Sequence, residues 1–163
     1  MRLIFHGMRR LCILLVCAPF AAVAQDNDYG SNLSRVYFAH QRLLAVREAC
    51  DQAFPAQAKA AERAFATWHA RHKALLEELD ARLTLMMRGA SKDEREFVRN
   101  VGKYEGAILE YRVEQRKQIL EQPRDGMEQG CADFRNYLTG SGSDFHSEYA
   151  EELRVLRERK LPK

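Results

Sequence analysis

The sequence predicts an all-α protein, an antiparallel helical bundle of four to five helices built on a long central helical hairpin and held by one disulfide. Apolar side chains recur at steps of three and four residues over most of the chain beyond residue 32, which is the spacing of helix faces. Val, Ile and Thr are sparse and nowhere alternate with a period of two, so no strand is expected. Residues 33–161 form one domain, long enough to bury its own core.

The first 24 residues have the order of a secretory signal peptide. Arg9 and Arg10 precede an apolar run, and Ala22-Val23-Ala24 has the A-x-A form of a cleavage site. The run is shorter than the roughly 20 apolar residues that span a bilayer. We therefore expect cleavage before Gln25 and a periplasmic or secreted protein, with no membrane span in the mature chain.

Two alternatives concern the same leader. The run Leu14-Leu15-Val16-Cys17 resembles a bacterial lipobox, although Val16 stands where that pattern has a small residue. In that case the protein would be a lipoprotein anchored through Cys17. Met8 is an alternative start to Met1, because Met8-Arg9-Arg10 alone supplies the basic region of the signal.

The formal net charge of +3 belongs to the leader. The whole chain has 26 basic and 23 acidic side chains, and the leader holds three of the basic and none of the acidic ones. The remaining chain is therefore neutral, with 23 of each sign. Because it has no excess positive charge with which to displace counterions from a phosphate backbone, we expect no nucleic-acid binding.

A polar segment at residues 25–32 is expected to be a flexible lead-in to the bundle. The first helix follows it with an apolar stripe that runs from Val36 to Ala53 at steps of three and four residues. Pro55 marks the end of this helix, because proline cannot continue the backbone hydrogen bonds.

The second and third helices form the predicted central hairpin. The second spans residues 56–88 and stops at Gly89. The third spans residues 92–121, and Ser91 to Glu94 has the spacing of a capping box that would open it. Because the connection between them is short, the two helices are expected to be antiparallel.

Two shorter helices complete the predicted bundle. Asp125 to Glu128 has capping spacing and is expected to open the fourth helix, and residues 140–143, rich in Gly and Ser, break it. The last helix is expected over residues 144–160, where Phe145, Tyr149 and Leu153 form one stripe.

Cys50 and Cys131 are the only cysteines beyond the leader, and an even pair in an oxidising compartment predicts one disulfide. Cys50 lies just before the Pro55 turn. The antiparallel third helix returns to that end of the bundle, and Cys131 follows it in the chain. On the second helix, Trp68 shares the stripe of Phe65 and is expected in the core.

The sequence lacks the signatures of several enzyme classes. It has no Cys-x-x-Cys-His, no His-Glu-x-x-His, no glycine-rich phosphate loop and no Gly-x-Ser-x-Gly. No histidine beyond the leader has a Glu three residues before it, as in di-iron bundles. We therefore expect a protein that is not an enzyme and that carries no cofactor.

Three histidines form a candidate metal site. His69 and His72 are three residues apart and share a helix face, while His40 and His69 lie at similar distances on either side of the Pro55 turn. Antiparallel helices would place His40, His69 and His72 at one height, as a zinc or copper site requires. The alternative is that His72 is a core histidine held by a hydrogen bond.

A candidate partner-binding surface lies near Gly89, at the end of the hairpin remote from the cysteines. It consists of Leu85, Met86, Met87 and Phe97. Either the last helix covers these side chains or they remain exposed, and adjacent Leu and Met side chains form the adaptable kind of surface that binds proteins.

One stretch of the chain resembles a known group of proteins. Residues 50–55 (Cys-Asp-Gln-Ala-Phe-Pro) and 64–68 (Ala-Phe-Ala-Thr-Trp) are similar to small helical periplasmic proteins, including the lysozyme-inhibitor-like group with its Cys and Ala-x-x-x-Trp pattern. The further cysteines of those proteins are missing here, and we assign no family from this stretch.

These features together predict an exported, non-catalytic helical protein of the bacterial envelope. We expect a protein-interaction module, such as an inhibitor, an immunity-type protein, an adaptor or a stress-related binder. Its partner would be another envelope protein or a second copy of the chain. The alternative function is a metal- or small-ligand-binding bundle that uses His40, His69 and His72.

Overall fold

The computed structural model describes residues 29–159, and within them it is all-α, as predicted. The helices are α1 (Tyr29–Ala53), α2 (Pro55–Gly89), α3 (Glu94–Leu120), α4 (Arg124–Thr139), α5 (Phe145–Glu148) and α6 (Ala150–Glu158), with a 3-10 turn at Ser141–Ser143. The expected signal peptide, with Met8 and Cys17, lies outside the described residues. No helix among the described residues is long and apolar enough to cross a membrane.

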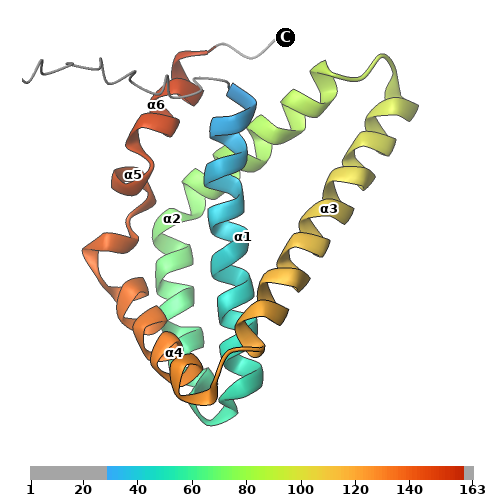
Figure 1. Cartoon of the computed structure of the whole chain (residues 1–163). Helices are drawn as coiled ribbons and strands as arrows, with labels where there is room; N and C mark the ends of the chain where they lie inside the picture. Colours follow the sequence, from blue (N-terminus) through green and yellow to red (C-terminus); the bar gives the residue numbers. More distant parts are fainter. Residues whose placement is uncertain (1–28, 160–163) are drawn as a thin grey trace, which may run out of the picture.

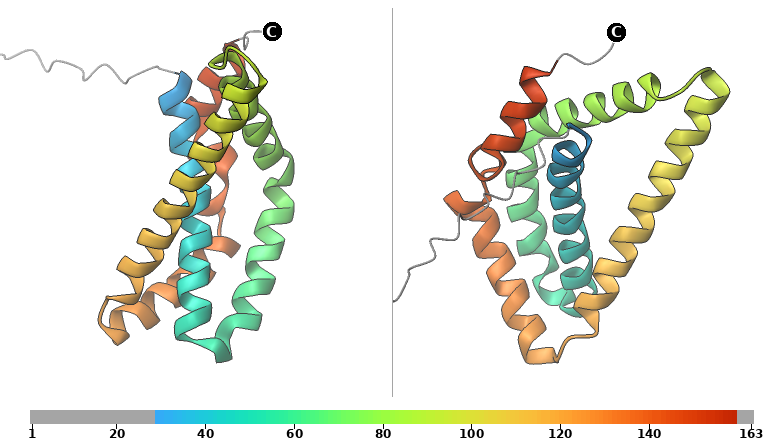
Figure 2. Two further views of the ribbon diagram at one scale, coloured as in Figure 1. Left: turned by 90° about the vertical axis from the view of Figure 1, so that its right-hand side faces the viewer. Right: turned by 45° about the horizontal axis from the view of Figure 1, so that its top comes forward.

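The bundle is organised around α1, which lies between α3 on one side and α4 to α6 on the other (Figure 1). α2 and α3 are consecutive and antiparallel, but α3 packs mainly on α1 and contacts α2 little. The two helices of the hairpin diverge from their short connection, and α1 occupies the space between them (Figure 2).

The main core gathers the inner faces of α1, α2, α4 and α6 around Trp68. Trp68 is fully buried, and its indole Nε1 donates to the Ser143 carbonyl oxygen at 2.8 Å. The ring also meets Phe145 edge to face, with centroids 5.0 Å apart. The expectation that Trp68 lies in the core is confirmed, and its polar atom is bonded, as a buried indole requires.

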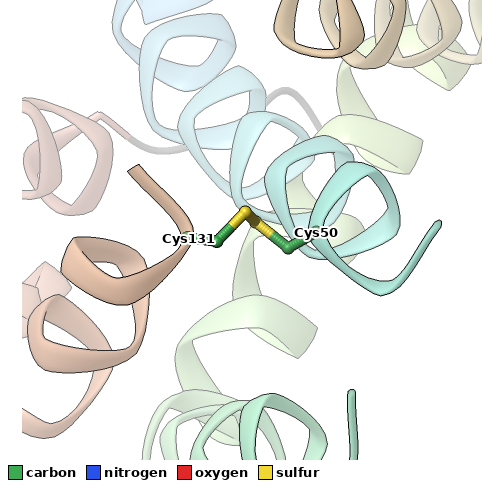
Figure 3. Close-up of a disulfide and its surroundings, with 2 residues drawn as sticks. All are labelled: Cys50 and Cys131. Carbon is green, nitrogen blue, oxygen red and sulfur yellow. A yellow bond between two sulfur atoms is a disulfide. The ribbon is translucent and has the colours of Figure 1, made fainter. Parts of the chain in front are cut away.

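The disulfide between Cys50 and Cys131 is present and joins α1 to α4 (Figure 3). The two Cα atoms are 5.6 Å apart. Phe54 and Met127 pack beside the bridge, so a second, smaller apolar cluster closes this end of the bundle.

The N-terminal ends of α1 and α3 differ from the sequence expectation. α1 begins at Tyr29, inside the expected lead-in, because the buried Tyr29 and Leu33 extend its apolar stripe. α3 is capped by Asp93, whose carboxylate accepts from the Glu96 N–H at 2.8 Å. Ser91 is unavailable as a cap because its hydroxyl donates to the Met87 carbonyl at the end of α2.

The C-terminal part of the chain also differs from the expected pattern. α4 begins at Arg124, directly after Pro123, with no side-chain cap; Asp125 lies in its first turn, where a carboxylate favours the helix dipole. The expected last helix is divided at Tyr149 into α5 and α6. The carboxylate of Asp144 accepts from the His146 N–H and so starts the single turn of α5.

Candidate functional site

A hollow that combines charged and aromatic side chains runs along α1. This α1 groove encloses about 530 Å³ between α1, α3, α4 and the α5 region. Its lining consists of Arg35, Phe38, Ala39, Arg42, Leu43, Val46, Tyr111, Tyr137, Phe145, Glu148 and Tyr149. A volume in this range is typical of ligand and peptide sites in proteins.

Helical spacing explains how α1 builds the floor of the groove. Arg35, Phe38 and Arg42 are separated by three and four residues, so their side chains share one face of the helix. Leu33 and Val36 lie on another face of α1 and are fully buried in the core. The core therefore fixes the rotation of α1 and with it the direction of both arginines.

Aromatic contacts hold the walls of the groove in place. The rings of Phe38 and Tyr111 meet edge to face with centroids 4.7 Å apart, which ties α3 to the floor. On the other side, Phe145 and Tyr149 meet edge to face at 5.0 Å. Such edge-to-face pairs contribute about 0.5–1.5 kcal/mol beyond their buried area, so the apolar walls are preformed.

Hydrogen bonds and charges decide which groups the groove can accept. The Tyr137 hydroxyl donates to Glu148 Oε2 at 2.8 Å, and Arg35 pairs with Glu152 at 2.8 Å. Arg42 is exposed, and no carboxylate of residues 29–159 forms an ion pair with it. Arg42 is thus a guanidinium available to a ligand, and its planar fork suits a carboxylate.

The two tyrosines of the α4 and α5 wall stay protonated at neutral pH. Burial, and then the charge of Glu148, raises the pKa of Tyr149 to about 12. Burial and the hydrogen bond to Glu148 raise the pKa of Tyr137 as well. The groove therefore presents neutral phenol groups and apolar rings around one available cation.

The structure does not bring the three predicted metal ligands together. The rings of His40 and His69 are neighbours, with centroids 6.4 Å apart, beside a second hollow. His72 is fully buried elsewhere, because it lies on the Trp68 face of α2. No group of three or more candidate ligands that could hold a metal ion occurs among the described residues. The predicted three-histidine arrangement is corrected to a pair.

His72 is instead a core histidine held by hydrogen bonds, the alternative considered from the sequence. Its Nδ1 lies 2.9 Å from the Trp68 carbonyl oxygen, which only accepts, so Nδ1 carries the proton. Its Nε2 lies within hydrogen-bond distance of both the Phe145 N–H, at 3.2 Å, and Asp144 Oδ1, at 3.3 Å. The ring therefore links α2 to the start of α5.

The surroundings of the His40 ring differ from those of the His72 ring. Its Nε2 is buried and has no hydrogen-bond partner among the described residues. Burial, followed by the charges of His69, Arg112 and Arg47, lowers the pKa of His40 to about 4. The ring is thus neutral at pH 7.

The predicted partner surface near Gly89 is partly covered. Leu85 is 46% exposed, whereas Met86 and Met87 are half-buried against the main core. Phe97 is half-buried under the guanidinium of Arg88, which lies 3.5 Å from the ring centroid. Of the four predicted residues, only Leu85 is openly exposed, and partner binding at this tip stays a prediction.

Sequence reasoning missed the α1 groove. The helical spacing of Arg35, Phe38 and Arg42 was a usable signal, whereas the position of Tyr149 depends on how α5 folds back on α1. Comparisons with known proteins find no match among family models, curated proteins or solved structures. The role of each lining residue therefore follows from its own chemistry.

Proposed function

We propose that the chain is an exported, non-catalytic helical protein of the bacterial envelope that binds an acidic and apolar segment of a partner protein in the α1 groove. The observation that carries this proposal is the guanidinium of Arg42, which has no carboxylate partner within residues 29–159 and lies among preformed aromatic walls. A carboxylate of the partner would pair with Arg42. An apolar side chain next to it would pack on Phe38 and Tyr111.

The composition of the lining favours a protein partner. Tyr, Phe and Arg are the residue types enriched at the centres of protein interfaces. The lining holds no Ser, Cys or His, so the common pairs of nucleophile and base are not among its residues. The groove is open along α1, which suits an extended or helical segment.

Export supports the envelope as the place of action. The first 24 residues have the order of a signal peptide, and the Cys50–Cys131 bridge suits an oxidising compartment. Inhibitors, immunity-type proteins, adaptors and stress-related binders all act through such contacts, and the proposal covers this class.

The test is quantitative capture from an envelope extract with purified wild-type protein and two charge-reversed variants. Arg42→Glu removes the available cation, and Arg63→Glu is the matched control, because Arg63 is exposed on α2 outside the groove. We expect a partner whose yield falls at least about tenfold with Arg42→Glu and stays unchanged with Arg63→Glu. Equal capture by all three proteins would refute binding at the groove.

Metal binding is the second candidate function, and one observation favours it. His40 Nε2 is buried without a hydrogen-bond partner, and its ring neighbours that of His69. Two guanidinium groups, of Arg47 and Arg112, act against it, because the charge that lowers the pKa of His40 also repels a cation. Calorimetric titration of wild type and of His40→Ala with Zn²⁺ tests this function. If the protein binds metal at this site, wild type gives a heat of binding and His40→Ala gives none.

A further inference from the structure

The outward face of α3 carries apolar side chains that no described element covers. Val98 is 61% exposed, Leu109 56% and Val113 45%. Their spacing places all three on one face of the helix. Gly102 and Gly106 lie on the same face, and a Cβ built at either would meet no atom within 4 Å. The views in Figure 2 show α3 as an outer helix of the bundle.

This face is additional to the one that α3 needs for folding. Ile108 and the half-buried Tyr104 belong to the inner stripe that packs towards α1. At 100° per residue, the outer stripe is rotated from the inner one by roughly 140°. A helix that packs on one neighbour needs a single apolar stripe, and a second, exposed stripe marks an interaction surface.

The charges beside the outer stripe identify its occupant. We propose that this face binds the same face of a second copy of the chain, with the two α3 helices antiparallel about a two-fold axis near Gly106. Such an axis brings one flank of α3 against the same flank of its mate. On that flank the facing pairs are then Glu96 with Lys117, Arg99 with Glu114, and Lys103 with Glu110, all of opposite charge. At each end of the stripe Arg95 of one copy comes opposite Arg116 of the other, where Arg116 already pairs with Glu48 of its own chain.

The apolar residues fit the same register. Val98 of one copy lies opposite Val113 of the other, and Leu109 lies over the open surface at Gly102. A large side chain over a glycine allows two helices to approach closely.

The central charged pair is available for this contact. Neither Lys103 nor Glu110 forms an ion pair with another residue of the described range 29–159. The surface is also separate from the α1 groove, because Tyr111 reaches that groove from the inner side of α3. The two proposals can therefore fail independently.

Sedimentation velocity of the disulfide-bonded protein over about a hundredfold concentration range tests the dimer. We expect a reversible monomer–dimer equilibrium. Leu109→Lys is expected to weaken it at least tenfold, because it puts a charge at the centre of the interface (about 1.4 kcal/mol or more). Ala70→Lys is the control, an exposed residue of α2, and is expected to leave the equilibrium unchanged. Leu85→Lys probes the alternative interface at the Gly89 end.

Charge exchange tests the register. Lys103→Glu and Glu110→Lys, taken singly, are expected to weaken the dimer, because each places like charges across the axis. The double variant exchanges both signs and is expected to restore it. On the opposite flank Glu105 approaches its own symmetry mate, so Glu105→Gln is expected to tighten the dimer.

Several results would overturn the inference. A wild-type protein that stays monomeric over the whole range has no such interface, and a dimer that survives Leu109→Lys but not Leu85→Lys lies at the Gly89 end instead. A dimer that the double charge exchange does not restore has a different register. Arg42→Glu is expected to leave dimerisation unchanged, which separates this test from that of the groove.

Discussion

The two longest helices are similarly amphipathic, yet the protein buries them to very different extents. α2 contributes eight buried side chains over 35 residues, whereas Ile108 is the single buried residue of the 27 in Glu94–Leu120. α2 packs against both α1 and α4, while α3 rests mainly on α1. A helical stripe therefore tells which side of a helix faces the protein, but not how completely that side is covered.

Hydrogen bonding differs between the same two regions. In the α2 core, Trp68 Nε1 and both ring nitrogens of His72 have partners, although His40 Nε2, where α1 meets α2, is buried without one among the described residues. At the contact of α3 with α1, the hydroxyl of Tyr104 is buried without a partner among the described residues, and burial raises its pKa to about 12. We infer that the α2 core carries most of the stability and that α3 is held more weakly.

The largest expected effect is in the α2 core. Trp68→Ala removes a fully buried ring and its bond to Ser143, and is expected to lower the free energy of unfolding by about 3–5 kcal/mol. Tyr104→Ala on α3 removes a half-buried ring and is expected to cost about 1–2 kcal/mol. Urea denaturation of both variants measures the difference. Equal losses would contradict the contrast between the helices.

The second-largest effect on stability is expected from loss of the Cys50–Cys131 disulfide. It closes a loop of 81 residues that contains both α2 and α3, and its loss is expected to cost about 2–5 kcal/mol. Urea denaturation with and without reductant measures this, and the double variant Cys50→Ala/Cys131→Ala should not respond to reductant. Two free thiols in the mass spectrum of the unreduced protein would show that the bridge is not formed.

Acid is expected to act through His40, which lies where α1 meets α2. The pKa is about 4 in the folded protein and about 6.5 in the unfolded chain, so the unfolded chain binds the proton first as the pH falls. The free energy of unfolding therefore decreases between about pH 6.5 and pH 4, by at most about 3 kcal/mol. His40→Gln should flatten this decrease, and the exposed His146→Gln should not. An unchanged profile for His40→Gln would rule out this role.

The smallest effect is expected at the α1 and α3 contact. Tyr104→Phe removes a buried hydroxyl that has no partner, so it is expected to be neutral or to stabilise the protein by up to about 1 kcal/mol. Thermal unfolding of Tyr104→Phe and of wild type measures this. A clear loss of stability would mean that the hydroxyl has a partner in solution.

Local sequence signals predicted the parts of the fold that depend on one helix at a time. The expected second helix, 56–88, agrees with Pro55–Gly89 to within a residue at each end, and the Cys50–Cys131 bridge follows from the antiparallel course of the chain. Where two side chains can fill the same capping position, the sequence alone did not predict which of them would do so. Both Ser91 and Asp93 can cap α3, and the bond of Ser91 to α2 decides in favour of Asp93.

The candidate site was less predictable because it depends on three-dimensional neighbours. His72 lies three residues from His69, as a second metal ligand on the same helix face would. The structure instead buries His72 in the core beside Trp68, where its ring is hydrogen-bonded. The α1 groove needs Tyr149, whose position follows from the short α5 turn. The apolar spacing of the outer stripe of α3 can be recognised in the sequence, yet only the fold shows that nothing in residues 29–159 covers it.

Native-state hydrogen exchange at protein concentrations below dimerisation tests the contrast between α2 and α3 most directly. Each amide reports the free energy of the opening that exposes it. We expect the amides around Ile108 of α3 to exchange through an opening of lower free energy than those around Trp68 of α2, which should exchange only on global unfolding. The same opening free energy for both helices would contradict the account, because α3 would then be as firmly held as the core.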